Sequence, residues 1–223
     1  MPIIQIPIIL VIFVYCLFWL SLVMKSNENR AKLKTEDYLN LEREANFSLK
    51  KEISKDLFVE PEMESLPIRE YADLEKFKYV IRAQQAVIRR KEHKMIKFKK
   101  AMSNRELKVA FGYSNLETIT AYEENFVKYV FTLCSWAESL MEAGENCDAE
   151  VILKKAIYLG AEQSKPYLLL MDIYCKENNK DALVEFKEAF EKEYGLEMDS
   201  ILKSKIEKGF AAALGETWEA KTI

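Results

Sequence analysis

Side chains that could carry out catalysis or bind a metal are few in this chain. His93 is the only histidine among 223 residues, which excludes any site that needs two imidazoles, including a His-rich zinc centre. The sequence contains no glycine-rich phosphate-binding motif and no nucleophile elbow. Two sets of carboxylates could be imagined as acid–base or cation sites, Glu123 with Glu124, and Glu142, Glu145 and Asp148. Their spacing is typical of solvated charge on exposed helices. We therefore predict that the protein is not an enzyme and has no catalytic residue, metal site or cofactor.

The cysteines point to a reducing compartment. Cys16 lies in an apolar stretch, whereas Cys134, Cys147 and Cys175 are scattered and lack C-x-x-C spacing. Three cysteines cannot all pair, and scattered thiols are typical of intracellular proteins.

Residues 3–24 carry no charge and include one strongly polar side chain, Gln5. A helix of this length spans roughly 33 Å, close to the ~30 Å hydrocarbon core of a bilayer. A cleaved signal peptide would need a basic residue before the apolar stretch and a small-residue cleavage site after it, and both are absent. We predict a transmembrane helix within residues 1–24. The basic residues that flank this helix all follow it; they are Lys25, Arg30, Lys32 and Lys34. By the positive-inside rule, the N-terminus should lie outside and the rest of the chain in the cytoplasm.

The remainder predicts an all-α fold, because the 6 glycines and 5 prolines are about 5% of the chain against a usual ~12%. Apolar residues recur at 4-3 spacing and predict a helix packed along one stripe, with Gln84 and Lys91 as polar interruptions; the stripe comprises Phe77, Ile81, Gln84, Ile88, Lys91, Met95, Phe98 and Met102. Ser103 and Glu106 match a capping box that begins a short helix ending near Gly112. The predicted divisions are a stalk and linker over 25–73, a basic helix with capping helices over 74–129, a repeat region over 130–214 and a tail over 215–223.

A small-large-small pattern repeats in the C-terminal half. Ala149, Leu153 and Ala156 are followed 33 residues later by Ala182, Phe186 and Ala189. Gly144 and the pair Asn178 and Asn179 lie where helical hairpins need turns, and Asp199 can cap a last helix whose apolar stripe seals the end. Here the sequence resembles tetratricopeptide (TPR) repeats, in two units over about 65 residues. It departs from that family at Trp136, Ala137 and Ala161, where Leu, Gly and Pro are usual. The overall layout also resembles small bacterial single-pass proteins with a cytoplasmic TPR-like domain and no assigned activity.

The TPR resemblance implies a solenoid with a groove that holds a peptide or helix of a partner. Its register assigns to that groove Phe131, Cys134, Glu138, Tyr167, Met171 and Tyr174. The alternative is that the 74–102 helix fills the groove.

A second candidate surface is basic. Residues 76–108 hold 12 basic and 2 acidic side chains, a charge of +10 that leaves −13 for the rest of the chain. On a domain tethered to the inner leaflet these cations could contact anionic lipid, or an acidic partner, or form an ordinary solvated face. We do not expect nucleic acid, because few aromatic residues accompany the charges. The candidate residues are Arg82, Arg89, Arg90, Lys94, Lys97 and Lys100.

The sequence therefore predicts a membrane-tethered cytoplasmic adaptor that binds a protein partner through its helical repeats. An accessory structural subunit of a membrane complex is the first alternative, and an enzyme without a recognised motif is another.

Overall fold

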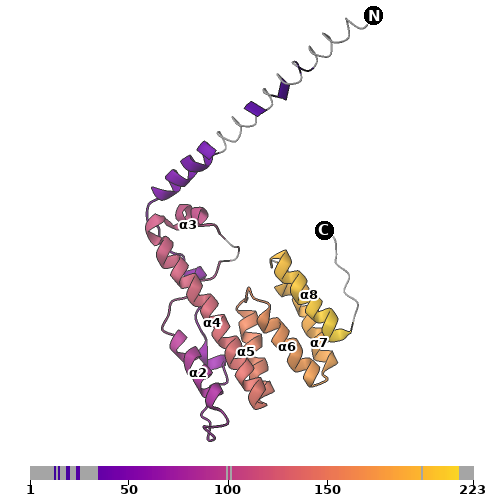
Figure 1. Cartoon of the computed structure of the whole chain (residues 1–223). Helices are drawn as coiled ribbons and strands as arrows, with labels where there is room; N and C mark the ends of the chain where they lie inside the picture. The colour runs from indigo at the N-terminus through magenta and orange to yellow at the C-terminus, as the bar shows by residue number, and fades with distance from the viewer. Residues whose placement is uncertain are drawn as a thin grey trace, which may run out of the picture. The chain divides into compact units, whose positions relative to one another are not determined.

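The computed structural model describes residues 13, 15, 19–20, 24–25, 35–98, 100, 102–196 and 198–215 (Figure 1). Over these residues the chain is helical and forms no β-strand, which confirms the all-α prediction. The predicted transmembrane span over 3–24 and the tail after Gly215 lie almost entirely outside the described residues. Among the residues that are described, no helix is both long and apolar enough to cross a membrane. The chain divides into two compact units, residues 1–52 with 102–116 and residues 53–101 with 117–223.

The smaller unit joins a helix over 35–46 to α3 (Asn104–Phe111). Ser103 and Glu106 form the predicted capping box at the start of α3. The Ser48 hydroxyl donates to the Lys108 carbonyl at 2.6 Å, and the ammonium of the buried Lys108 pairs with Glu42. These bonds explain why residues 102–116 group with the segment before residue 53 and not with 74–101, where the predicted division placed them.

In the larger unit, residues 53–77 form two short 3-10 turns, Lys55–Leu57 (η1) and Met63–Ser65 (η2), before α2 (Lys78–Arg90). Gln84, the polar residue in the apolar stripe, is buried on α2. Its side-chain amide accepts from the Arg69 N–H at 3.2 Å and donates to the Arg69 carbonyl at 3.0 Å. A buried amide is therefore satisfied by backbone, which allows a polar group inside the stripe.

The predicted helix over 74–102 is wrong beyond Arg90. After a polar turn the chain becomes extended, and Ile96 forms a single antiparallel bridge with Phe58. The Val59 N–H donates to the Met95 carbonyl at 2.9 Å, and the Lys97 N–H donates to the Leu57 carbonyl at 3.0 Å. Met95, Ile96 and Phe98 are all buried. The extended backbone is favoured over a continuous helix because it buries Ile96. In a continuous helix, Ile96 would lie off the apolar stripe.

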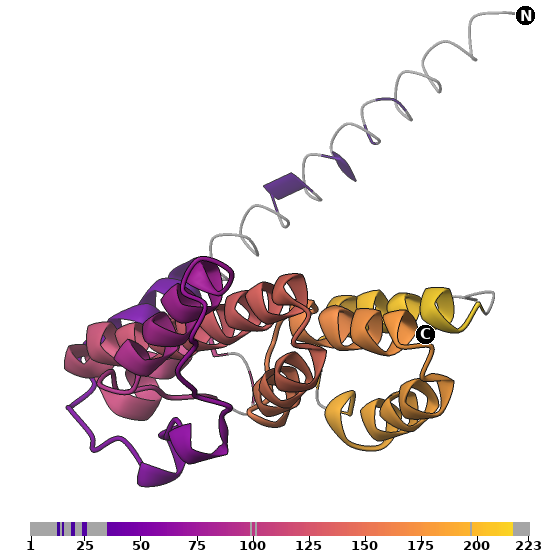
Figure 2. The ribbon, with the colours of Figure 1, turned by 90° about the horizontal axis from the view of Figure 1, so that it is seen from below.

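Helices follow one another from residue 116 onward (Figures 1 and 2). They are α4 (Leu116–Ala143), α5 (Asn146–Tyr158), α6 (Lys165–Lys176), α7 (Lys180–Ala189) with the π turn η4 (Phe190–Tyr194), and α8 (Ser200–Leu214). Gly144 (φ +86°) and Asn178 (φ +53°) make the predicted turns in the left-handed region. Asp199 caps α8 by accepting from the N–H groups of Ile201 and Leu202 at 2.9 and 3.3 Å. These local signals set where the helices begin and end.

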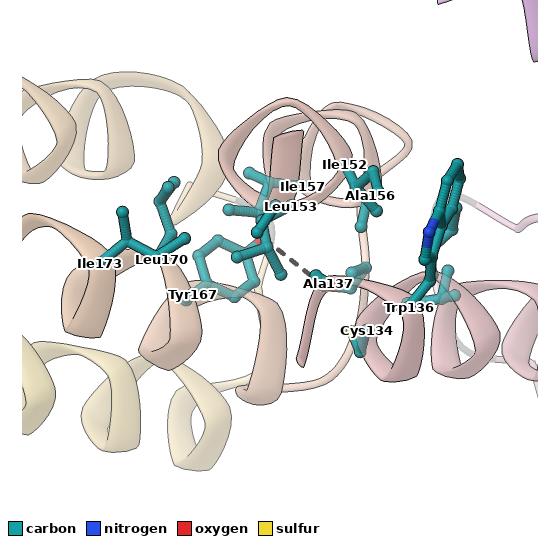
Figure 3. Close-up of a cluster of buried hydrophobic side chains, with 14 of the residues drawn as sticks. Cys134, Trp136, Ala137, Ile152, Leu153, Ala156, Ile157, Tyr167, Leu170 and Ile173 are labelled. Carbon is teal, nitrogen blue, oxygen red and sulfur yellow. Dashed lines mark hydrogen bonds between the residues drawn. The ribbon is translucent and has the colours of Figure 1, made fainter. Parts of the chain in front are cut away.

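The core of the larger unit runs through α4, α5 and α6 (Figure 3). Trp136 and Ala137 of α4, Leu153 and Ala156 of α5, and Tyr167 of α6 belong to one buried cluster. All five side chains are buried. Small residues let the helix axes approach closely, and each large side chain buried here contributes about 1.5–3 kcal/mol.

Candidate protein-binding groove

The three predicted groove residues on α4 differ in exposure. Phe131 is 54% exposed, and the Lys165 ammonium lies 5.4 Å from its ring centroid. Glu138 is half-buried and pairs with the same ammonium at 2.8 Å. Cys134 is fully buried, and burial raises the pKa of its thiol to about 12. Phe131 and Glu138 are thus at the surface, whereas Cys134 belongs to the core.

The three predicted groove residues on α6 are buried, so the expectation of an open groove over Tyr167, Met171 and Tyr174 needs correction. Their side chains are 1%, 3% and 3% exposed. The Tyr167 ring stacks on Phe186 of α7, with 6.4 Å between ring centroids. A β-carbon added at Gly209 of α8 would lie 3.2 Å from the Met171 sulfur. The predicted register is wrong here because α7 and α8 fold over this face of α6. Lys97 and Phe98 of the 74–102 segment also line the hollow beside Tyr167.

A different groove opens between α5, α6 and α7. It encloses about 380 Å³ and is lined by Glu150, Lys154, Ile157, Tyr158, Leu170, Tyr174, Ala182, Glu185, Phe186, Ala189 and Tyr194. Tyr158 stands at its rim with 69% of its surface exposed, whereas Leu170 is fully buried. On α5 the small residues Ala149 and Ala156 are fully covered. Their counterparts on α7, Ala182 and Ala189, are half-buried and line the hollow, so the missing side-chain volume leaves space there.

One side of the groove is a closed polar network. The Tyr174 hydroxyl donates to a Glu150 carboxylate oxygen at 2.9 Å, and the Lys154 ammonium pairs with that carboxylate at 2.7 Å. Burial, together with Glu150, raises the pKa of Tyr174 to about 12. The hydrogen bond with Glu150 raises the pKa of Lys154. At neutral pH, Tyr174 therefore stays a phenol, and the two charges beside it balance each other.

The other side of the groove carries an unbalanced negative charge. Glu185 is exposed and makes no ion pair within the described part of the chain. Tyr194 comes from the π turn, a rare backbone form that often occurs at functional sites. Phe190, which begins this turn, is buried against Tyr167 and Phe210, with 5.7 and 5.6 Å between ring centroids. The turn thereby anchors one aromatic ring in the core and leaves Tyr194, four residues on, at the groove.

Among the lining residues, sequence analysis assigned only Tyr174 to a groove, and it named Ala182, Phe186 and Ala189 as part of the repeat. It did not identify the others, which are Glu150, Lys154, Ile157, Tyr158, Leu170, Glu185 and Tyr194. The repeated Ala182 and Ala189 were a usable signal, although the pattern was interpreted as close helix contact. No residue pattern marks the π turn, so Tyr194 could not be placed.

The predicted basic residues fall into two places. Arg82, Arg89, Lys94 and Lys100 are exposed and Arg90 is half-exposed, on α2 or the segment after it. Lys97 is half-buried and packs against Gly160 in the α5–α6 turn. It also lines a second hollow of about 520 Å³ that contains Asp56, Glu162 and Glu193. Lys97 thus faces an acidic surrounding and is separate from the cations of α2.

The groove offers aromatic and acidic side chains for binding and no nucleophile beside a base. Within the described residues, no three His, Cys, Asp or Glu side chains come together in a way that could hold a metal ion. Comparison with known proteins found no matching family model, no matching curated protein and no matching solved structure.

Proposed function

We propose that this protein is a membrane-tethered adaptor whose TPR-like hairpins bind a segment of a partner protein in the groove between α5, α6 and α7. The observation that carries the proposal is the groove itself, in which Tyr158, Tyr174 and Tyr194 surround a hollow. Tyrosine is enriched at protein interfaces because it supplies a large apolar ring and a polar tip at small entropic cost.

The spacing of the hairpins supports the TPR-like part of the proposal. α5 begins at Asn146 and α7 at Lys180, a separation of 34 residues, which is the length of a TPR unit. Most of the groove lining comes from α5 and α7, the second helices of the two units, and Leu170 and Tyr174 of α6 complete it. The proposed binding face is therefore different from the one that the family resemblance implied.

The chemistry of the groove selects the kind of partner segment. Its apolar floor, Ile157, Leu170 and Phe186, suits one apolar side chain. The unpaired carboxylate of Glu185 at the α7 side suits a neighbouring Lys or Arg on the partner. We therefore propose a peptide or helix that presents an apolar anchor beside a basic residue.

The tether is the predicted transmembrane helix over 3–24. Its uncharged length supports a membrane location, and the basic residues after it support a cytoplasmic domain. Such a tether raises the effective concentration of the domain for other membrane proteins, so that a modest affinity is enough.

Photocrosslinking in membranes that contain the full-length chain tests the proposal. A photoreactive phenylalanine replaces Tyr158 at the groove or, as the control, Tyr113, which is also exposed but lies in the smaller unit. We expect one recurrent protein to be captured from position 158 and not from position 113.

Two further variants connect that product to the groove. Ala182→Phe fills the hollow and should abolish the crosslink, while circular dichroism checks that the helices remain. Glu185→Gln should weaken capture about fivefold, the effect of losing about 1 kcal/mol. Glu188→Gln, one turn further on α7 and paired with Lys192, should have little effect. Equal capture from both label positions, or capture that survives Ala182→Phe, would rule the groove out.

A further inference from the structure

The exposed face of α2 carries cations without carboxylate partners. Arg82, Arg89 and Arg90 project from one side of the helix, because Arg89 and Arg90 follow Arg82 by seven and eight residues, about two helical turns. None of the three makes an ion pair within the part of the chain that the structure describes. Tyr79 lies on the same side and is 68% exposed.

This arrangement differs from that of the other helices. α4, α5 and α6 each hold a lysine paired with a carboxylate four residues earlier; the pairs are Lys128 with Glu124, Lys154 with Glu150, and Lys176 with Asp172. α2 has no acidic residue in its 13 positions. An ordinary solvated helix face mixes both signs of charge, so the α2 face has the composition of a surface that meets an external anion.

The buried side of α2 packs in the domain, through Val80, Gln84 and Val87. The helix therefore cannot insert deeply into a bilayer, and only its charged side is available. A rigid basic face with a tyrosine suits the headgroup layer, where anionic phosphates attract Arg and Lys and where Tyr is enriched.

We propose that the exposed side of α2, formed by Tyr79, Arg82, Arg89 and Arg90, docks the domain onto anionic lipid headgroups of the membrane that holds the chain. The proposal rests on the membrane tether of the proposed function, because a tethered domain meets those headgroups continuously. Acidic proteins and nucleic acids share the charge of the headgroups but would not be held beside α2 by the chain itself.

The test uses the full-length chain in lipid nanodiscs, in a background where Cys16, Cys147 and Cys175 are changed to Ser. A fluorophore on Gln85→Cys, which lies between Arg82 and Arg89 along the helix, reports contact with lipids that carry a quencher on the headgroup. A fluorophore on Val184→Cys, exposed on α7, is the control position. The discs contain either neutral lipid alone or about a third anionic lipid.

Quenching at position 85 should exceed that at position 184 in anionic discs, and should fall in neutral discs or at about 0.5 M salt. The triple variant Arg82→Gln, Arg89→Gln, Arg90→Gln should lower the ratio of docked to free domain about a hundredfold, at about fivefold per cation. The control triple variant Lys128→Gln, Lys176→Gln, Lys192→Gln removes the same charge from other helices and should retain the quenching.

Equal quenching at both positions, or quenching that the Arg triple variant leaves unchanged, would overturn the proposal. The same would follow if that variant lost binding to a fluorescent single-stranded oligonucleotide but kept its lipid contact, since the face would then be a nucleic-acid site. Failure of the tether is detected separately, because a chain without a membrane anchor would not co-elute with the discs.

Discussion

Two buried tyrosines of the larger unit differ in whether their hydroxyl has a partner. Among the residues that the structure describes, the buried Tyr129 hydroxyl has no hydrogen-bond partner, whereas the Tyr174 hydroxyl donates to Glu150. Removing an unsatisfied buried hydroxyl is favourable, and removing a satisfied one leaves its acceptor short of a bond. We expect Tyr129→Phe to raise the free energy of unfolding by about 1 kcal/mol and Tyr174→Phe to lower it by about 1 kcal/mol. Urea unfolding measures both, and effects of the same sign would show that Tyr129 has a partner.

Thiol reactivity should separate Cys134 from the other two cysteines of the helical region. Cys147 and Cys175 are exposed, while burial raises the pKa of Cys134 to about 12. Because only the thiolate reacts, this pKa alone slows alkylation of Cys134 at pH 8 about a thousandfold. Mass spectrometry after a timed pulse of iodoacetamide measures the rates. In urea the three rates should become similar, and rapid native labelling of Cys134 would contradict its burial.

At the scale of elements, the extended segment after α2 predicts that truncation of Ile96 costs more stability than truncation of Ile88. A continuous helix would predict the opposite order. Ile96 is fully buried in the extended segment, and Ile88 on α2 is 40% exposed. Ile96→Ala should cost about 3 kcal/mol of unfolding free energy, and Ile88→Ala less than about 1 kcal/mol. A helix through residue 102 would have put Ile88 in the packed stripe and Ile96 outside it. Urea unfolding of the two variants distinguishes these arrangements, and a larger loss at Ile88 would favour the helix.

The helix ends could be predicted because their signals are local. Ser103, Asp199 and the turn at Gly144 act within a few residues of themselves, so the sequence is enough to locate them. The extended segment could not be found in this way, because Ile96 pairs with Phe58, 38 residues earlier in the chain. A 4-3 pattern shows which residues are apolar. It does not show which distant segment will pair with them.

The groove was missed for a similar reason. Tyr167 and Met171 have the residue types of a binding face, and whether such residues are open depends on how α7 and α8 fold over α6. The same helix packing leaves the alanines of α7 half-exposed and so creates the hollow elsewhere. Residue types therefore indicate which side chains are apolar enough to be buried or to form a binding face. Which aromatic residues remain accessible depends on the tertiary packing of the helices.

At the scale of the whole molecule, stability should fall in alkali. Burial raises the pKa of Tyr129 and of Tyr174 to about 12, and it also raises the pKa of Tyr167. An unfolded tyrosine loses its proton near pH 10, so above that pH the unfolded state binds fewer protons than the native state. The free energy of unfolding should therefore decrease as pH rises from about 9 to 12, and these groups should have no effect between pH 6 and 8.

Urea midpoints measured across this pH range test that decrease. Lysine deprotonation also acts there, so Tyr129→Phe serves as the matched control. It removes one of the linked protons and should make the decline less steep. An identical slope in the variant would mean that Tyr129 ionises equally easily in both states.

The charge around the predicted transmembrane span leads to a prediction for the complete chain in its membrane. Four basic residues closely follow residues 3–24; they are Lys25, Arg30, Lys32 and Lys34. The positive-inside rule predicts that the helical hairpins lie in the cytoplasm, where we expect the exposed thiols of Cys147 and Cys175 to stay reduced. In intact cells a membrane-impermeant maleimide should label Pro2→Cys and spare Cys147 and Cys175. After permeabilisation it should label all three. Labelling of Cys147 in intact cells would reverse the orientation, and recovery of the chain in the soluble fraction would remove the anchor on which both the adaptor and the lipid-docking proposals depend.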